Sequence, residues 1–258
     1  MPASRRDRLF FYIGEPDSNC LIVFAPAVII IAMRIALTKY GLPQVVIFPV
    51  ITAILMAVCA FGAAYLNLWV LAGVEVVLAV PLIFSLAFFR DPQRTVPQGD
   101  KLFVAPADGT IKDIEEVNET GHIGGRALRI GIFLSIFNAH INRMPCEVKV
   151  EQTVYKKGKF RDARDPLAGK VNESNDLMLV RIKEPTDKVI VRQISGAVAR
   201  RIVCQARPGD ASASGEKFGM IKFGSRTELY IPLRDDIECM VKVGDKVKAG
   251  LTILARYK

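Results

Sequence analysis

The sequence has few of the residues that usually build metal centres or disulfide frameworks. It contains two histidines and one tryptophan among 258 residues, and its five cysteines are scattered along the chain. The absence of a CxxC pair or a Cys/His cluster argues against a bound metal. An odd number of dispersed cysteines also fits reduced thiols in a cytoplasmic domain better than a disulfide framework. We therefore expect no metal cofactor.

Charged residues are scarce in the first third of the chain. Residues 1–89 contain five Lys or Arg and four Asp or Glu, whereas residues 90–258 contain 30 and 22. This segregation separates an apolar membrane anchor, residues 1–89, from a charged, folded domain. The positive charge of that domain suits attraction to anionic lipid and ordinary solubility equally well. A nucleic-acid partner is not expected, because the sequence has no basic stripe interleaved with aromatic residues.

The anchor is predicted to contain a hairpin of two transmembrane helices. Residues 41–74 contain no charged side chain, and this run exceeds the roughly 20 residues that one helical span requires. A second apolar stretch follows Glu75. The pattern predicts helices at about 46–66 and 69–89, with both ends of the hairpin on one side of the membrane.

A shorter apolar stretch, residues 21–38, precedes the hairpin. It contains a proline and Arg34, and we expect it to be interfacial or re-entrant rather than a third span. Basic residues flank the hairpin on both sides, with Lys39 before it and Arg90 after it. By the positive-inside rule, this places both flanks in the cytoplasm. We therefore expect a protein of the cell (inner) membrane with its folded domain on the cytoplasmic side.

Residues 90–100 are predicted to be a linker, because Asp91-Pro92 and Pro97 resist helix formation. Residues 101–258 then show short apolar runs separated by Gly, Pro, Asp and Asn, which predict a β-rich (α+β) domain. A weak internal repeat relates residues 208–224 to residues 243–255. Its Gly-Asp turns are typical of the flattened, barrel-like β-sandwich of biotinyl and lipoyl domains, although such turns are common in other β proteins.

Five short motifs follow one another in the second part of the chain: FFRDPQR (88–94), APADG (105–109), FNAHINRMP (137–145), NESN (172–175) and FGSR (223–226). Each motif is weak alone, but the ordered set is specific. In this set the chain resembles the phosphatidylserine decarboxylase family, in particular its short, membrane-anchored branch. The resemblance covers roughly residues 45–258.

The resemblance implies a proenzyme that cuts itself between Gly224 and Ser225 and converts Ser225 into a covalent pyruvoyl cofactor. The residue types suit this chemistry, since the Ser225 hydroxyl can attack the Gly224 carbonyl and glycine leaves that carbonyl unshielded. The implied substrate is phosphatidylserine, a membrane phospholipid, and the product is phosphatidylethanolamine. The implied partners are the large and small chains of the cut proenzyme.

Two further residues are predicted to be catalytic. His140 lies in the motif FNAHINRMP, whereas His122 lies in a turn-like segment and is expected to be a solvated loop residue. An ordinary histidine pKa of about 6.5 would suit His140 as a proton donor in turnover. In the family, the aspartate that matches Asp108 helps to activate the serine through a histidine, and we expect Asp108 to act mainly in maturation.

The motif around His140 departs from the better-known branch of the family. His140 matches the first of two family histidines, and Arg143 stands where the second is expected. We favour the use of His140 in both self-cleavage and turnover; the alternative is that Asp108 works with Arg143 or with a water molecule.

Three polar side chains are candidates for binding the phosphate or carboxylate of the substrate: Asn142, Arg143 and Arg226. A guanidinium group matches both anions bidentately, although solvation at the surface explains such residues equally well. Glu173 and Asn175 match the motif NESN without a role that chemistry assigns.

Other functions remain open from the sequence. The chain could decarboxylate another serine phospholipid, such as archaetidylserine, because only the lipid tails differ. It could also be a membrane-tethered adaptor with a biotinyl-like domain, or a serine hydrolase that uses an intact Ser225, although no GxSxG elbow surrounds that serine. The sequence leaves the oligomeric state open, a homo-oligomer included.

Overall fold

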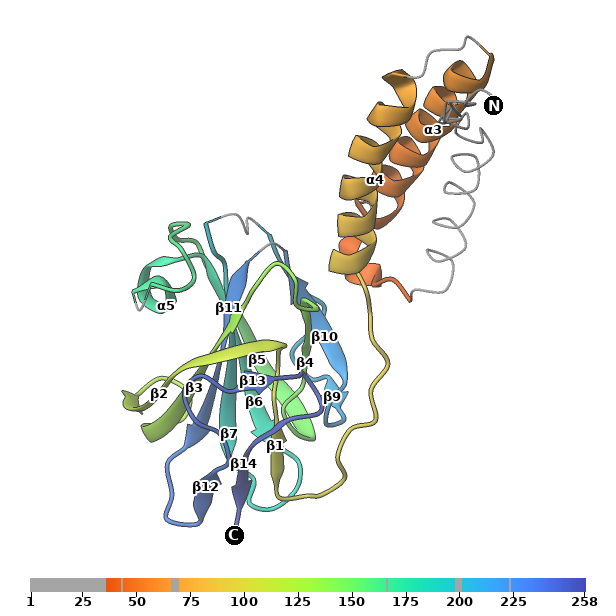
Figure 1. Cartoon of the computed structure of the whole chain (residues 1–258). Coiled ribbons are helices and arrows are strands. Elements are labelled where there is room, and N and C mark those ends of the chain that lie inside the picture. Colours follow the sequence, from red (N-terminus) through yellow and green to blue (C-terminus); the bar gives the residue numbers. More distant parts are fainter. Residues whose placement is uncertain (1–35, 43, 66–69, 166, 198–200, 223) are drawn as a thin grey trace, which may run out of the picture.

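The computed structural model describes residues 36–42, 44–65, 70–165, 167–197, 201–222 and 224–258. A pair of long helices projects from one end of a β-rich domain (Figure 1). The expected combination of an apolar helical hairpin with a β-rich domain is therefore confirmed.

The hairpin consists of α3 (Gln44–Tyr65) and α4 (Val70–Phe88), preceded by the short 3-10 helix η1 (Lys39–Gly41). Both helices are long and apolar enough to cross a membrane. Met56 of α3 packs against Leu82 and Leu86 of α4, but most of the large apolar side chains of the pair are exposed. Helices that are apolar on all sides and largely uncovered need a lipid environment or a further partner.

The two ends of the hairpin are joined beside the β-domain. Residues 21–35 of the apolar stretch expected to be interfacial lie outside the described residues. Its last residues, 36–38, run extended, and Leu37 forms an antiparallel bridge with Arg90. The Thr38 N–H also donates to the Phe89 carbonyl at 3.0 Å. The chain therefore enters and leaves the hairpin at neighbouring points.

The described residues of the β-domain form three sheets, and every pair of named strands is antiparallel. The largest sheet has eight strands, in the order β13 (Lys246–Val247), β2 (Gly109–Glu119), β3 (Gly125–Leu134), β11 (Ser225–Pro232), β7 (Lys188–Ile194), β6 (Ser174–Arg181), β5 (Val148–Lys156) and β9 (Ala211–Ser212). The two smaller sheets are β1 (Leu102–Val104), β14 (Ile253–Tyr257) and β12 (Ile237–Cys239), and β4 (Ile141–Arg143), β10 (Lys217–Ile221) and β8 (Ile202–Cys204). The short helix α5 (Ala168–Val171) lies between β5 and β6.

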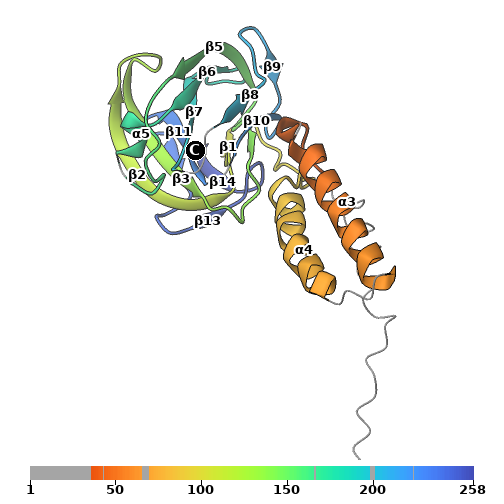
Figure 2. The same cartoon turned by 90° about the horizontal axis from the view of Figure 1, so that it is seen from above.

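The eight-stranded sheet curves around the apolar core, as the view from above shows (Figure 2). Alternate residues of its strands point into this core; on β11 these are Leu229 and Ile231, both fully buried. Successive side chains of a strand point to opposite faces. Ser225 and Thr227 therefore share the inner face of β11, whereas Arg226 and Glu228 lie on its outer face.

The internal repeat of the sequence is also present in the structure. Gly209 and Gly244 have φ angles of 95° and 97°, in the left-handed region that favours glycine. Asp210 and Asp245 each accept a hydrogen bond from the backbone N–H three residues earlier, at 2.8 and 2.9 Å. Each turn leads into a short strand at one edge of the large sheet, β9 beside β5 and β13 beside β2. Two similar units therefore close the two edges of this sheet.

Candidate active site

The Gly224–Ser225 pair lies at the start of β11. Gly224 has a φ of 61°, a left-handed conformation that a glycine adopts without strain. Ser225 is fully buried, and its Oγ has no hydrogen-bond partner among the described residues. A Cβ atom added to Gly196 would lie 2.2 Å from the Gly224 carbonyl oxygen. The backbone at Gly196 thus packs directly against the carbonyl that Ser225 would attack.

His140 lies beside the connection that leads to Ser225. Strand β4 pairs with β10, and Ile141 is opposite Met220. Continuing this register by one residue places His140 opposite Ile221, just before the turn at Gly224. The ring is fully buried, and its centroid lies 4.3 Å from that of Phe88 at the end of α4.

One nitrogen of His140 is fixed by a hydrogen bond, and the other has no partner among the described residues. Nδ1 lies 2.9 Å from the Asn138 carbonyl oxygen. Because a carbonyl can only accept, Nδ1 carries the hydrogen, and Nε2 of the neutral ring is an acceptor. Nε2 is buried without a hydrogen-bond partner in the described part of the chain. The ring is therefore arranged as a base.

The pKa of His140 is not the ordinary value that the sequence-based expectation assumed. Burial lowers the pKa of His140 to about 4, the hydrogen bond to Asn138 opposes this shift, and the charge of Arg90 adds to it. The ring is consequently neutral at pH 7. In the uncleaved chain His140 is suited to accept a proton, and it could donate one only after taking it from another group.

Asp108 is held by an arginine and a backbone amide rather than by a histidine. Its carboxylate forms two hydrogen bonds with Arg94, at 2.5 and 2.8 Å, and accepts a third from the Ala249 N–H at 2.8 Å. No hydrogen bond between Asp108 and a histidine is present among the described residues, although the charge of Asp108 acts on His140 and opposes the lowering of its pKa. Arg94 is the last residue of the motif FFRDPQR, which was the only sequence signal for its importance.

A chain of buried amide groups leads to the strand that carries Ser225. Asn175 donates to Gln193 at 3.1 Å, Gln193 donates to Asn142 at 2.9 Å, and Asn142 donates to Thr227 at 3.1 Å. Asn142 is fully buried, and its side-chain oxygen and nitrogen both have protein partners. This network gives Asn142 and Asn175 a place in the structure. Gln193 had no signal in the sequence except its position on the inner face of a β-strand.

The motif NESN supports the backbone behind Gly224. The Asn172 amide donates to the Ser195 carbonyl at 2.8 Å, and the Glu173 carbonyl accepts from the Ser195 N–H at 2.9 Å. Gly196 follows directly and packs against Gly224. Asn172 and Glu173 therefore fix the segment that limits the position of the Gly224 carbonyl.

Arg143 connects the linker to the β-domain. Its guanidinium donates to the Gly215 carbonyl and to the Pro92 carbonyl, both at 3.0 Å. The side chain is buried, and a carboxylate oxygen of Asp91 lies 3.7 Å away. A substrate anion would have to replace one of these internal partners.

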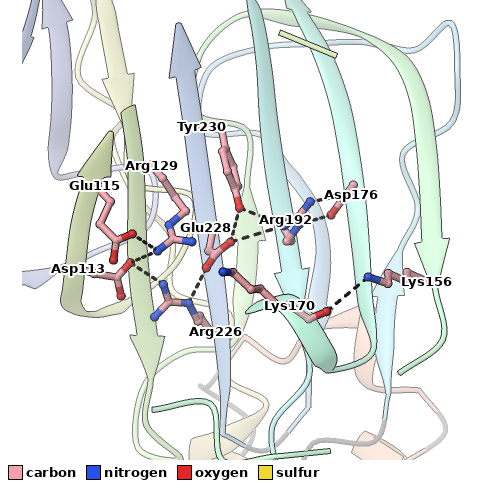
Figure 3. Close-up of polar contacts among 10 residues, drawn as sticks. All are labelled: Asp113, Glu115, Arg129, Lys156, Lys170, Asp176, Arg192, Arg226, Glu228 and Tyr230. Atoms are coloured by element: carbon pink, nitrogen blue, oxygen red, sulfur yellow. Dashed lines mark hydrogen bonds and ion pairs between the residues drawn. The ribbon is translucent and has the colours of Figure 1, made fainter. Parts of the chain in front are cut away.

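Arg226 lies on the outer face of β11, away from the face of Ser225. It donates to Asp113 at 2.6 Å and to Glu228 at 2.8 Å, as Figure 3 shows. Burial alone would lower the pKa of the Arg226 guanidinium, but these two carboxylates raise it above its ordinary value. The structure therefore does not bring Arg226 together with the other predicted site residues.

These features define a β-rich domain with an attached apolar hairpin, in which a buried serine follows a left-handed glycine and a buried histidine directly precedes β4, which pairs with β10. The family model described as phosphatidylserine decarboxylase matches residues 82–255. The chain belongs to the phosphatidylserine decarboxylase family.

Curated relatives agree with this assignment. The phosphatidylserine decarboxylase proenzyme of Carboxydothermus hydrogenoformans is 44% identical over 76% of this chain and 88% of its own length. The proenzyme of the same name from Pelobacter propionicus is 40% identical over 81% of this chain and 94% of its own length. The family resemblance found in the sequence motifs is therefore confirmed.

Proposed function

We propose that this chain is a proenzyme that cuts itself between Gly224 and Ser225, and that the mature enzyme decarboxylates phosphatidylserine to phosphatidylethanolamine. Family membership supports the reaction and the substrate. The observation that carries the cleavage is the buried Ser225 Oγ, which has no hydrogen-bond partner in the described part of the chain and directly follows the left-handed Gly224.

The chain's own residues account for the self-cleavage. The Ser225 Oγ attacks the Gly224 carbonyl carbon, and its proton passes to Nε2 of His140. The peptide bond breaks at the Ser225 nitrogen, which takes the proton back from His140, and Gly224 is left esterified to Oγ. Loss of the Ser225 α-proton and breakage of the Cβ–Oγ bond then release the Gly224 carboxylate and leave dehydroalanine. Hydrolysis of this residue releases ammonia and leaves a pyruvoyl group at position 225.

A pyruvoyl group fits this position, because the first residue of β11 faces the polar end of the core that contains Thr227 and Asn142. The group supplies an electrophilic carbonyl that reacts with the substrate amine and withdraws electrons as CO₂ leaves. Nε2 of His140 would accept a proton that is released as the substrate amine reacts with this carbonyl, and would return it to the carbon that loses CO₂. This sequence uses the low pKa of His140 rather than requiring a protonated ring at the start.

We propose a supporting role for the remaining site residues. Asp108 and Arg94 set the position of the segment before β2 and act mainly in maturation. Asn142 positions Thr227 and, through it, the start of β11. Arg143 and Arg226 would contact substrate only by exchanging internal partners, and we expect their replacement to affect folding first.

We propose that the mature protein remains one particle after cleavage. The large chain would be residues 1–224 and the small chain residues 225–258. The small chain contains β11, which lies between β3 and β7 in the large sheet. It also contains β14, which pairs with β1 of the large chain. These backbone ladders and the shared core hold the two chains together without the peptide bond.

We further propose that α3 and α4 cross the inner membrane and that the β-domain lies in the cytoplasm. The helix lengths and the basic flanks at Lys39 and Arg90 support this arrangement. Residues 21–38 would then lie at the interface. The kinship of the β-domain with biotinyl and lipoyl domains is also a proposal, supported by the matching turns at Gly209 and Gly244.

The replacement Ser225→Ala tests the proposed cleavage. We expect the wild-type chain to give two fragments on a denaturing gel, with a small chain whose mass shows a blocked, pyruvoyl N-terminus. Ser225→Ala should remain one full-length chain and release no phosphatidylethanolamine, because it lacks the attacking hydroxyl. Ser212→Ala, at the edge strand β9, is the matched control and should cut normally. Normal cutting of Ser225→Ala would contradict the proposal.

A further inference from the structure

The loop between β3 and β4, residues 135–139, presents large apolar side chains to solvent. Phe137 is 74% exposed and Ile136 is 40% exposed. The loop is not loose, because the side chain of Asn138 accepts from the Ser135 N–H at 2.9 Å and the Asn138 N–H donates to the Ser135 carbonyl at 2.9 Å. An ordered turn thus holds an aromatic ring outward, where water is a poor environment for it.

This loop lies at the domain end of the helical hairpin. The guanidinium of Arg90 donates to the Phe137 carbonyl at 2.7 Å and to the Ala87 carbonyl, at the end of α4, at 2.5 Å. His140, directly after the loop, packs on Phe88 of the same helix. The exposed ring is therefore fixed next to the point where α4 would leave a bilayer.

Residues of the same loop other than the exposed Phe137 lie beside the candidate active site. Leu134, just before it, pairs with Ser225 across the β3–β11 ladder. A Cβ atom added to Gly224 would lie 3.9 Å from Ile136 Cγ2. The Asn138 carbonyl holds Nδ1 of His140. A loop that touches the bilayer would thus also lie beside the Gly224–Ser225 pair and His140.

The surroundings of the loop suit an anionic lipid surface. Lys39, at the start of η1, and Arg201, beside β8, are exposed, and Leu42, close to the start of α3, is 54% exposed. Cations close to apolar and aromatic side chains are the usual composition of a protein surface that meets lipid headgroups.

We propose that loop 135–139 inserts Phe137 and Ile136 into the bilayer surface beside the hairpin, and that a phospholipid headgroup reaches position 225 directly from the membrane along this loop. The inference rests on the proposed function, because it assumes that the reacting molecule is a lipid. It adds a membrane contact within the β-domain itself, separate from the helical anchor.

Two forms of the substrate separate the membrane contact from catalysis. The enzyme is compared on long-chain phosphatidylserine in phosphatidylcholine vesicles and on dihexanoylphosphatidylserine as a dispersed monomer. For Phe137→Ser we expect normal self-cleavage, near wild-type turnover of the monomer, and turnover of the vesicle substrate reduced by about tenfold, since the ring would no longer be buried in lipid. Ile182→Ser is the matched control: it removes an apolar side chain that is 44% exposed at the far end of the sheet, and should leave both rates unchanged.

A fluorescence experiment tests the insertion without activity. Trp69 is the single tryptophan of the chain, so Phe137→Trp in a Trp69→Phe background reports on this position alone. Vesicles with brominated acyl chains should quench this tryptophan and should not quench Ile182→Trp in the same background. Absence of quenching at position 137, or equal loss of vesicle and monomer turnover in Phe137→Ser, would overturn the inference. If Phe137→Ser changes the oligomeric state and the tryptophan at position 137 is not quenched, the loop contacts protein rather than lipid. That result would also overturn the inference.

The proposed function fails in a different way. If the wild-type protein releases phosphatidylethanolamine from neither substrate, the reaction itself is wrong, whatever the fluorescence shows. If it acts on both and Phe137→Ser matches the wild-type protein on vesicles, only the role of the loop is wrong.

Discussion

His140 differs from a histidine in water in two ways that both affect proton transfer. Burial against Phe88 lowers its pKa to about 4, and the Asn138 carbonyl fixes the hydrogen on Nδ1. A neutral ring with a free Nε2 is a base that is ready at any pH above about 5. The same burial would make an imidazolium there a strong acid once it forms, which suits the return of a proton to carbon.

The rate of self-cleavage should show this low pKa. The folded pKa lies below the unfolded value of about 6.5, so the acceptor form persists in the folded chain as the pH falls to about 4. We expect a rate that is flat from about pH 8 to 5.5 and half-maximal near pH 4, measured on proenzyme made by cell-free synthesis. The low pKa of His140 in the folded chain also contributes roughly 3 kcal/mol to the free energy of unfolding above about pH 6.5, and this contribution is lost as the pH falls to about 4. Circular dichroism must therefore accompany the assay. A midpoint near pH 6.5 would show that the base is another group or an exposed histidine.

His140→Ala separates the two uses of the ring. If His140 serves both steps, the variant should cut slowly and should also release little phosphatidylethanolamine, each by roughly 10²–10⁴-fold. If it serves turnover alone, fragments form normally and only the product is lost. His122→Ala is the control for a histidine outside the candidate site; His122 is not solvated as the sequence suggested, because the β2–β3 turn buries it and its Nε2 lies 3.0 Å from the Leu179 carbonyl oxygen. Near wild-type rates for both steps in His140→Ala would remove His140 from the mechanism.

At the scale of residues, the sequence offers candidates for the reactive groups more readily than for the residues that support them. Ser225, His140 and Asp108 lie in short motifs, so local patterns are enough to propose them as reactive groups, and their roles stay predictions. Gln193 and Gly196 act through contacts with residues that are distant in sequence or across a strand, and no local pattern marks such contacts. The pKa of His140 was misjudged because it depends on burial by Phe88, which only the fold brings into place.

The segment of residues 91–99 joins the apolar hairpin to the β-domain and contacts the candidate active site. It has no regular structure from Asp91 to Gly99, yet its polar side chains are well held. Asp91 pairs with Lys217 at 2.6 Å, and Arg94 forms the double hydrogen bond with Asp108. The prolines of residues 90–100 predict a linker of irregular structure. They do not predict that its side chains attach to the β-domain.

The Arg94–Asp108 pair can be tested by removing each partner and then both. Both side chains are largely buried, at 7% and 10% exposure, so either single variant, Arg94→Gln or Asp108→Asn, should lose about 3–5 kcal/mol of unfolding free energy. The double variant should recover much of that loss, since neither charge is then left unpaired. Unfolding is measured in detergent in the uncut Ser225→Ala background.

Cleavage then distinguishes a structural role from a specific need for the carboxylate. If Asp108 acts in maturation, the double variant should be stable and still cut slowly. If the pair only stabilises the fold, the double variant should cut like the wild-type protein. Arg126→Gln removes an exposed partner of Glu116 and should change stability by less than about 0.5 kcal/mol, which makes it the control.

Local sequence patterns predict where helices and strands form more readily than how these elements are arranged. The hairpin was predicted at 46–66 and 69–89, and the helices are Gln44–Tyr65 and Val70–Phe88, because an uncharged run has few alternatives to a helix. The short β-runs predicted a β-rich domain, but the order of the strands depends on pairings between distant segments. The pairing of β11 with β3 on one side and β7 on the other is an example of such a long-range pairing.

At the scale of the whole molecule, the charged residues are concentrated in one of its two structural parts. The β-domain and linker carry most of the cations of the chain, while the exposed side chains of α3 and α4 are largely apolar. With the domain in the cytoplasm, this charge would face the anionic leaflet and hold the substrate lipid near the site. Ser225 begins β11 beside loop 135–139, which Arg90 joins to the end of α4, so a site at Ser225 would lie close to the surface of a membrane that the hairpin crosses.

The orientation of the hairpin predicts which positions an impermeant reagent can reach from outside the cell. In a variant whose native cysteines are replaced, a cysteine at position 67, between the helices, should react with an impermeant maleimide on intact cells. A cysteine at position 258 should react only after the membrane is opened, because it lies in the cytoplasmic domain. Basic residues on both flanks make the opposite orientation unfavourable. Labelling at position 258 but not at position 67 would reverse the orientation. Labelling of both positions only after lysis would show that the hairpin enters the membrane without crossing it.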